Sequence, residues 1–212
     1  MKHIPHTVVA LPWDGDSLPL SIVQWRHLTK VLRMKRGDAV TYTDGLGRIG
    51  SGVLGSQSVE RGEEQTVERP SALTVAVSPP ASKDRQRFLV EKLAELGVAR
   101  LVWLKTAQGK NRVANPSKVF SWVLAAVEQS RGAWLMETSA DLAAIDELSG
   151  SVVVCRPGGR KDPGRFDIVV IGPEGGFAEC EVPDHLSSWD LGPTILRVET
   201  AAIVAASRAI FG

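Results

Sequence analysis

The chain has 212 residues, of which 43% are hydrophobic and 23% are charged, and its formal net charge is +1. This length and composition suit a globular protein with one large domain or two smaller ones. Because positive and negative charges nearly cancel, the charge of the whole molecule does not indicate a nucleic-acid partner. Such a partner has to be inferred from local clusters of Lys and Arg.

The two cysteines, Cys155 and Cys180, lie far apart in the sequence and without CxxC spacing. This argues against a disulfide framework, a zinc site and a dithiol redox centre, so we expect no metal and a location in the reducing cytoplasm. Residues 1–10 lack the continuous apolar core of a signal peptide, and no window has the uninterrupted apolar length of a membrane span. We therefore expect a soluble protein with no membrane partner.

The first third of the sequence predicts a small β domain. Residues 8–11, 39–43 and 49–54 are apolar or β-branched runs separated by turn residues, which predicts three short strands. Residues 22–34 carry apolar side chains at helical spacing, which predicts a short helix between the strands. Residues 55–71 are polar and acidic without a periodic apolar pattern, so a hairpin loop and an interdomain linker are expected there.

From residue 71 onward, strand and helix patterns alternate. Apolar runs predict buried strands at residues 73–77, 100–104, 152–154 and 168–171. Apolar residues at helical spacing predict helices at residues 84–96, 116–131 and 201–211. A strand, a helix and a further strand in succession require a crossover between parallel strands. The sequence therefore predicts an α/β domain with a parallel sheet, separated from the β domain near residue 70.

The most unusual local sequence is the turn Gly172-Pro173-Glu174-Gly175-Gly176, which follows the strand at 168–171 directly. Ligand sites in α/β proteins lie at the carboxyl ends of strands, and glycines there allow positive φ and a close approach of a ligand to backbone N–H groups. A tight turn without a ligand is the competing interpretation, because glycine-rich turns after strands are common. The glycines match neither the GxGxxG dinucleotide fingerprint nor a phosphate loop, so nucleotide phosphates are poor candidates.

A second turn, at residues 191–194, lies shortly before Arg197 and Glu199 and the predicted C-terminal helix. Arg197 and Glu199 are either functional or a surface ion pair of little energetic value. Basic residues concentrate in the windows 26–36 and 105–112. These windows would favour RNA phosphates, and a solvated charged face is the competing interpretation.

Five motifs together carry a resemblance to a known family. They are RHL followed by VLR and GD (26–38), EKLAELGV (91–98), EQS (128–130), IGPEGGF (171–177) and ILRVETA (195–201). In this order they make nearly the whole sequence resemble the RsmE family of small-subunit ribosomal RNA uridine-N3 methyltransferases, which belong to the SPOUT class. One such motif alone would be suggestive, whereas five in the same order are highly specific.

The resemblance implies the architecture, the cofactor and the partners. It implies an N-terminal PUA-like β-barrel that binds RNA over residues 1–70, and a SPOUT α/β methyltransferase domain with a parallel sheet and a trefoil knot over residues 71–212. It also implies a homodimer that binds S-adenosylmethionine near the subunit interface. The implied partner is 16S ribosomal RNA or the assembled small ribosomal subunit, in which N3 of a uridine is methylated.

The resemblance also assigns binding residues, with the cofactor held largely by backbone groups. The residues expected to bind S-adenosylmethionine are Val154, Cys155, Gly172, Pro173, Glu174, Gly175, Gly176, Leu191, Gly192, Ile195 and Leu196. The residues expected to bind RNA are Arg26, His27, Lys30, Arg33, Lys110 and Arg112.

Uridine N3 carries a proton and is a poor nucleophile while it does, so the site must accept that proton or stabilise the deprotonated base. Arg197 and Arg131 are the candidates for stabilising the base anion or for binding phosphate. Glu199 or Glu174 is the candidate for accepting the proton or for positioning. The family pattern has an arginine at the position of Gly132, and whether the preceding Arg131 replaces it is left open, because a shift of one residue turns a side chain by about 100° around a helix.

Other functions remain as alternatives. One is a SPOUT methyltransferase that acts on another RNA position or atom. Another is a non-catalytic RNA-binding dimer, against which the intact motifs at 171–177 and 195–201 argue. A Rossmann-type oxidoreductase would require a GxGxxG motif after an early strand, and the sequence has none.

Overall fold

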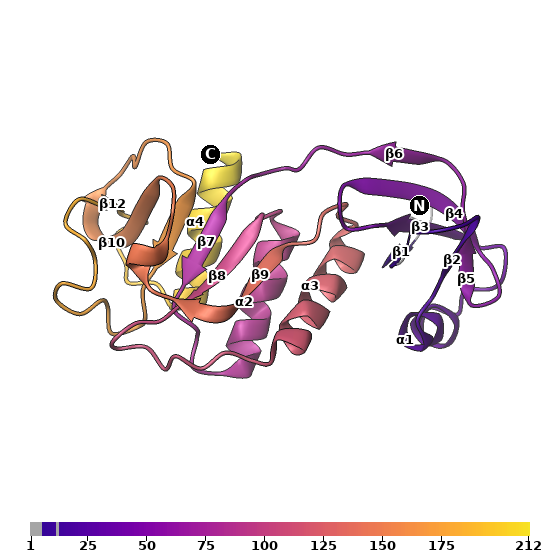
Figure 1. Ribbon diagram of the computed structural model, residues 1–212, viewed down its shortest axis with the longest axis horizontal. Coiled ribbons are helices and arrows are strands. Elements are labelled where there is room, and N and C mark those ends of the chain that lie inside the picture. The colour runs from indigo at the N-terminus through magenta and orange to yellow at the C-terminus, as the bar shows by residue number, and fades with distance from the viewer. Residues whose placement is uncertain (1–5, 12) are drawn as a thin grey trace. The chain divides into compact units, whose positions relative to one another are not determined.

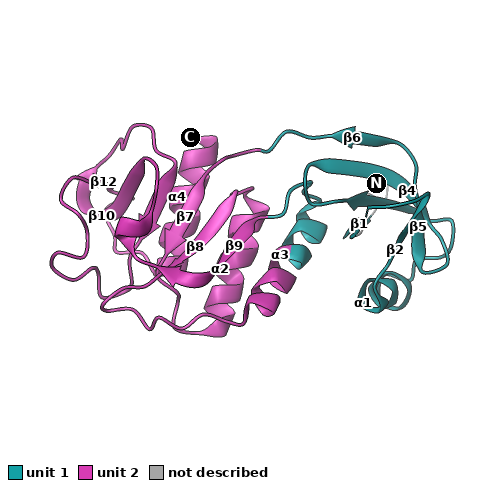
Figure 2. Cartoon of the chain, viewed as in Figure 1, with its two compact units in different colours: residues 1–69, 124–135 teal, residues 70–123, 136–212 magenta. Residues whose placement is uncertain are grey.

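The computed structural model describes residues 6–11 and 13–212, and the chain forms two compact units (Figure 1, Figure 2). Unit 1 comprises the described part of residues 1–69 together with Leu124–Leu135, and unit 2 comprises Pro70–Val123 and Met136–Gly212. The first change of unit lies next to residue 70, where the sequence predicts a boundary. Nothing in the sequence indicated that residues 124–135 group with unit 1.

Unit 1 contains a mixed six-stranded sheet. Its strands are β1 (His6–Val9), β2 (Ser17–Pro19), β3 (Ala39–Thr43), β4 (Arg48–Leu54), β5 (Ser58–Glu60) and β6 (Glu64–Thr66). They lie in the order β1-β3-β4-β5-β2 with β6 paired to β4, and β1 and β3 run parallel while the other pairs are antiparallel. The core of the unit packs around side chains such as Leu18, Tyr42 and Leu54, which are fully buried.

The segment expected to be a loop and a linker instead contributes strands β5 and β6. Each has three residues, and β6 is exposed at every position, so no periodic apolar pattern marks them in the sequence. They are held by antiparallel backbone pairing with β4, in registers such as Leu54↔Val59 and Ile49↔Gln65. The expectation of a loop was therefore wrong for these two strands.

The helix predicted at residues 22–34 is shorter and changes its winding. Helix α1 (Ile22–Arg26) begins with a capping box, in which the Ser21 hydroxyl accepts from Gln24 N at 3.2 Å and the Gln24 side chain accepts from Ser21 N at 3.1 Å. It continues as a π-helical turn, η1 (His27–Val31). Arg33 then has a φ of +56°, a left-handed conformation that ends the helix.

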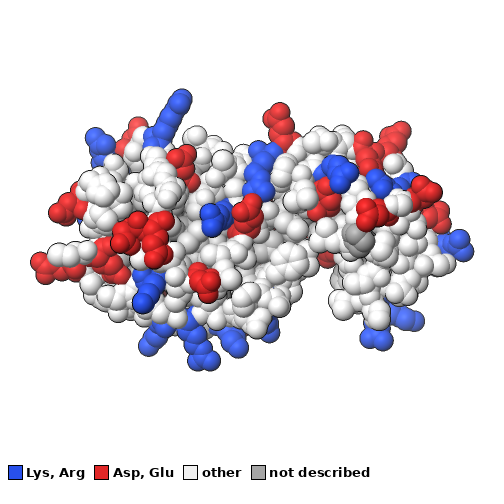
Figure 3. Space-filling model, viewed as in Figure 1, with Lys and Arg blue, Asp and Glu red and all other residues white. Residues whose placement is uncertain are grey.

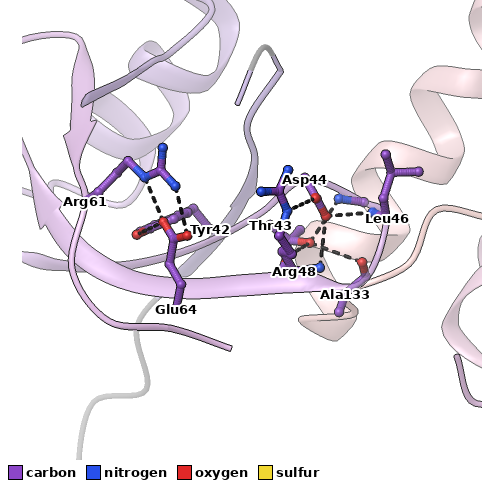
Figure 4. A network of polar contacts seen from close by, with 9 residues as sticks. Tyr42, Thr43, Asp44, Leu46, Arg48, Arg61, Glu64 and Ala133 are labelled. Atoms are coloured by element: carbon purple, nitrogen blue, oxygen red, sulfur yellow. Dashed lines mark hydrogen bonds and ion pairs between the residues drawn. The ribbon is translucent and has the colours of Figure 1, made fainter. Parts of the chain in front are cut away.

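A polar network closes the turn between β3 and β4 (Figure 4). Asp44 accepts hydrogen bonds from Leu46 N at 2.8 Å, Arg48 N at 3.0 Å and Arg48 Nε at 2.7 Å. Burial alone would raise the pKa of Asp44, but the Arg48 side chain and the two backbone N–H groups lower it below its ordinary value. The Thr43 hydroxyl lies 3.2 Å from the carbonyl oxygen of Ala133, which joins residues 124–135 to the sheet of unit 1.

Unit 2 is built on a six-stranded sheet in which every pairing is parallel. Its strands, in the spatial order β12-β10-β11-β7-β8-β9, are β7 (Thr74–Val77), β8 (Arg100–Leu104), β9 (Glu137–Ala143), β10 (Val152–Arg160), β11 (Ile168–Ile171) and β12 (Ser187–Trp189). Its helices are α2 (Lys83–Glu95), the first part of α3 (Pro116–Ser130), the 3-10 turn η2 (Ile145–Glu147) and α4 (Val198–Phe211).

The centre of the parallel sheet is buried. Every residue of β11 is buried, as expected for a strand with a neighbour on each side and covered faces. Helix α4 contacts α2, β11 and β7, and its fully buried Ala202, Ala205 and Ala206 allow a close approach. The α/β fold class, with a mixed N-terminal sheet and a parallel C-terminal sheet, is confirmed, whereas the trefoil knot stays a prediction of the resemblance.

Within the described part of the chain, no helix combines the length and the apolar character that a membrane crossing requires. The same residues contain no cluster of three or more His, Cys, Asp and Glu side chains suited to hold a metal ion.

Candidate functional site

A cavity of about 570 Å³ opens in unit 2 at the carboxyl end of β11 and beside residues 155–157 of β10. Four segments wall it: residues 155–157 within β10, the turn after β11 at 172–177, the loop at 178–184, and the loop and helix start at 190–201. Cys155 and Ile171 are register partners on adjacent strands, so the first two walls begin side by side. The carboxyl end of a parallel sheet is where α/β proteins commonly bind ligands, and the volume suits a small molecule.

The turn after β11 is shaped by glycines at two positions. A Cβ atom added to Gly172 would lie 2.7 Å from the ring of Phe177, so only glycine allows this ring to pack against the turn. Gly176 has a φ of +79°, and its N–H donates to the carbonyl of Pro173 at 2.9 Å, which closes the turn. The glycine-rich sequence therefore forms a tight turn that also lines a cavity.

The opposite wall is fixed by a carboxylate. Asp190 accepts a hydrogen bond from Gly192 N at 3.0 Å through one oxygen and from Gly158 N at 3.3 Å through the other. Gly192 has a φ of +143°, and a Cβ atom there would meet nothing within 4 Å. Beyond it, Ile195 is 88% exposed at the cavity, which leaves a large apolar side chain available to a ligand.

The charged residues of the cavity are mainly acidic. Its lining contains Glu174, Glu179, Asp184 and Asp190 but a single basic side chain, Arg156. Figure 3 shows acidic side chains gathered over the part of unit 2 that contains β10 and β12. Burial raises the pKa of Cys155, which also lines the cavity, to about 12, and this disfavours the thiolate, which is the reactive form of the side chain.

Beside the cavity, Arg85 on α2 joins two carboxylates. Its Nε and Nη2 donate to the two oxygens of Glu199 at 2.9 and 2.6 Å, and Nη2 also lies 2.8 Å from an oxygen of Glu174. Burial alone would raise the pKa of Glu199, but the hydrogen bonds and the charge of Arg85 hold it below its ordinary value. A paired carboxylate with a lowered pKa is a weak proton acceptor, so this geometry favours the positioning role of Glu199.

The residues predicted to bind the cofactor come together. All of them line the cavity except Val154, whose side chain is buried in β10. That they bind a cofactor stays a prediction.

The two arginines predicted to be catalytic are placed differently. Arg197 is the exposed residue that precedes α4, between the cavity-lining Leu196 and Val198. Arg131 lies in unit 1, has a φ of +59° and is exposed. The cavity is lined by residues of unit 2 alone.

The residues predicted to bind RNA are all exposed. Arg26, His27, Lys30 and Arg33 lie together on α1, η1 and the turn after them in unit 1. Figure 3 shows basic side chains at the edge of unit 1 near α1, and along the edge of unit 2 beneath α2 and α3.

Lys110 and Arg112 lie in unit 2, in the segment between β8 and α3. The backbone there is held by Gln86, which is buried, donates to the carbonyl of Arg112 at 2.8 Å and accepts from Ala114 N at 3.0 Å. These two hydrogen bonds fix the backbone from which the Arg112 side chain extends.

Sequence reasoning missed Arg85 and several residues of the cavity. Arg85 lies 114 positions from Glu199, and its only local signal is the Ser82 hydroxyl, which caps α2 and accepts from Arg85 N at 3.3 Å. The missed lining residues include Asp184 and Asp190. These follow no motif, and only the fold brings them to the cavity.

Comparisons with known proteins agree with this architecture. A family model described as an RNA methyltransferase domain matches residues 67–210, whereas no curated protein matches the chain. A solved probable rRNA-methyltransferase from Porphyromonas gingivalis is 24% identical, with a TM-score of 0.82 and 96% of each chain covered. The putative methyltransferase from Legionella pneumophila, in complex with S-adenosylmethionine, is 24% identical, with a TM-score of 0.83 and 97% of each chain covered.

A third solved structure is the ribosomal RNA small subunit methyltransferase E from Neisseria gonorrhoeae, bound to S-adenosylmethionine. It is 23% identical, with a TM-score of 0.80, and the match covers 97% of this chain and 96% of that chain. These similarities show a shared fold over nearly the whole chain, and the family model spans the elements from β7 to α4 that form the cavity. The chain belongs to the family of RNA methyltransferase domains.

Proposed function

We propose that this protein transfers the methyl group of S-adenosylmethionine to N3 of a uridine in the 16S ribosomal RNA of the small subunit. The observation that carries the proposal is the cavity at the carboxyl end of β11, where the glycine-rich turn at 172–176 and the loop at 190–196 meet. The solved structures from Legionella pneumophila and Neisseria gonorrhoeae, which contain this cofactor, support it.

The residues of the cavity fit S-adenosylmethionine. Its sulfonium and amino groups are positive, and the lining carries four carboxylates against one arginine. Its adenine needs an apolar surface, which Ile171, Leu191, Ile195 and Leu196 offer. At Gly192 a ligand meets backbone without a side chain in the way, because a Cβ atom there would point into open space.

When bound, S-adenosylmethionine supplies a methyl group already activated by the sulfonium. The protein therefore has to position the two reactants and deal with the N3 proton. Arg197 follows the cavity-lining Leu196 and is exposed, with no ion pair to another described residue. We assign it to the uracil oxygens, where its charge would favour loss of the N3 proton as the N3–methyl bond forms.

Arg131 and the RNA-binding residues act outside the cavity in this proposal. Arg131 is exposed and would bind an RNA phosphate, the second of the two roles considered for it. A base must be unstacked before its N3 reaches the methyl group, so contacts with the RNA backbone are needed on both sides of it. Arg26, Lys30 and Arg33 in unit 1 and Lys110 in unit 2 would provide them.

The test is mass spectrometry of nucleosides after the reaction. Small-subunit ribosomal RNA that lacks the modification is incubated with the protein and S-adenosylmethionine, both as free RNA and as assembled subunits. We expect 3-methyluridine, and its appearance in one preparation alone identifies the substrate form. A different methylated nucleoside would move the proposal to another RNA position, and cofactor binding without methylation would point to a non-catalytic RNA-binding dimer.

A further inference from the structure

The geometry points to Arg85 as a positioning residue that holds Glu174, and with it the glycine-rich wall of the cavity, in the arrangement that binds S-adenosylmethionine. Arg85 is not among the residues that line the cavity, so it acts through its partners. The inference rests on the proposed function for the identity of the ligand.

Three charge-assisted contacts fix the position of the Arg85 side chain. Two of them form a bidentate pair with Glu199, and the third reaches Glu174. The pair with Glu199 is largely withdrawn from water, because the whole Glu199 residue is 7% exposed. A guanidinium is planar and rigid, so a fork anchored on one carboxylate also fixes the direction of the second N–H of Nη2. That direction points at Glu174.

The triad connects an element outside the cavity to two of its walls. Arg85 lies in the first turn of α2, and Glu199 lies in the first turn of α4 beside the cavity-lining Val198. Glu174 lies in the turn after β11 and lines the cavity itself. Holding both carboxylates from one guanidinium keeps the two walls at a constant separation.

Glu174 retains a free oxygen for a ligand. Arg85 contacts its Oε1, and no other described residue forms a hydrogen bond or ion pair with its Oε2. The side chain of Glu174 is 48% exposed, so this oxygen is accessible to the donor groups of a ligand. The triad carries one positive and two negative charges, and the remaining negative charge suits a cationic cofactor. Without Arg85, the carboxylates of Glu174 and Glu199 would repel each other and Glu174 would lose its orientation.

The experiment measures S-adenosylmethionine binding by calorimetry, without RNA, for the full chain and matched variants. By the cost of removing a charged hydrogen bond, we expect Arg85→Met and Glu174→Gln each to weaken binding about tenfold or more. The control is Arg87→Met on the same helix. Arg87 is exposed, lies outside the cavity and forms an ion pair with Glu91 at 2.6 Å, which the substitution removes. We expect its affinity to stay within about twofold of the wild type.

The double variant Arg85→Met/Glu174→Gln separates positioning from a general structural role. If Arg85 acts through Glu174, the double variant binds about as weakly as the weaker single variant, because residues in one network are not additive. In steady-state assays of Arg85→Met, KM for S-adenosylmethionine rises by a larger factor than kcat falls. Arg85→Lys recovers part of the affinity, because it keeps the charge and loses the fork.

Two results would overturn the assignment: a folded Arg85→Met protein with wild-type affinity, or losses of affinity that add fully in the double variant. If Arg85→Met does not fold, Arg85→Lys takes its place, with an expected loss of about threefold to tenfold and the same dependence on Glu174. A wild-type chain that binds no S-adenosylmethionine would refute the proposed function. If the wild-type chain binds S-adenosylmethionine and the Arg85 variants bind it equally tightly, the role of Arg85 is refuted and the proposed function is not.

Discussion

The loop that lines the cavity at residues 190–196 contains a glycine, Gly192, in an unusual backbone conformation. Gly192 has a φ of +143°, and its N–H donates a hydrogen bond to the Asp190 carboxylate. Residues with a side chain rarely adopt such a positive φ. A substitution at Gly192 is therefore strained, even though open space surrounds the position of an added Cβ atom. Because this loop lines the cavity, strain in its backbone would also disturb ligand binding.

We predict that Gly192→Ala lowers the free energy of unfolding by about 1–3 kcal/mol and weakens S-adenosylmethionine binding. Urea denaturation and calorimetry measure the two effects. The control is Gly132→Ala, where φ is not positive and the nearest atoms to an added Cβ are 3.6 and 3.7 Å away, so its stability should change by less than about 0.5 kcal/mol. Equal losses of stability in both variants would contradict the role of the conformation at Gly192.

His6 predicts a pH dependence of stability. Burial lowers the pKa of His6 from its ordinary value of 6.5, His27 and Arg131 lower it further, and Glu128 opposes them. The His6 imidazole is therefore protonated at a higher pH in the unfolded chain than in the folded chain. The stability that neutral His6 contributes to the folded state is complete above pH 6.5 and is lost as the pH falls below this value. Denaturation between pH 7.5 and 5.5 should show this loss, and His6→Gln should reduce it. An unchanged slope in His6→Gln would exclude His6 as its source.

At the scale of elements, α4 depends on small side chains. Ala205 is fully buried on the helix, which packs against α2, β11 and β7, and the first turn of the same helix lines the cavity at Val198 and Ala201. We predict that Ala205→Leu overpacks this helix interface and costs about 1–3 kcal/mol of stability. It should also weaken cofactor binding, because the helix start shifts with the helix.

Ala209→Leu, at an exposed position of the same helix, is the matched control for Ala205→Leu. Thermal melting and calorimetry of both variants check the prediction. Equal stability of the two variants would show that α4 has room for a larger side chain at position 205.

Elements that bury a continuous apolar run could be predicted from the sequence, and elements held mainly by pairing could not. Strand β11 is four apolar residues with a neighbour on each side, and its prediction was correct. Strands β9 and β12 lie at the two edges of the same sheet and consist largely of polar or half-buried residues. Their strand conformation follows from hydrogen bonds with β8 and β10, which no local pattern encodes.

The candidate site divides in a similar way. The turn at Gly172–Gly176 was predicted from motifs, because glycine at a strand end is a local requirement of the chain. Arg85 was not predicted, because its role depends on Glu174 and Glu199, which reach it only through the order of strands in the sheet. Local conformation can be predicted from local sequence, whereas an interaction across 114 positions requires the fold.

At the scale of the whole molecule, the near-neutral net charge makes RNA binding depend on local patches. We predict that the double variant Arg26→Gln/Lys30→Gln weakens RNA binding. The slope of log K against log salt concentration should fall by about 0.7 for each phosphate of single-stranded RNA that the variant no longer neutralises. S-adenosylmethionine binding should be unchanged, since neither residue lines the cavity. Filter binding at several salt concentrations provides the measurement.

Arg208→Gln removes a single positive charge from an exposed position in the last turn of α4, and it serves as the control for the double variant. An equal fall of the salt dependence in Arg208→Gln would show that RNA binding depends on the net charge of the protein rather than on Arg26 and Lys30.

The grouping of residues 124–135 with unit 1 also determines how this protein can be divided. The chain passes between the units three times. A gene fragment that ends at residue 69 would therefore lack Glu128, which accepts from Val9 N at 3.1 Å and from the Gln24 side chain at 2.8 Å, and Ala133, which accepts from Gly47 N at 2.9 Å. Residues 1–69 therefore cannot be exchanged by recombination as a self-contained unit. A chimaera with another RNA-binding module has to replace residues 1–69 and 124–135 together.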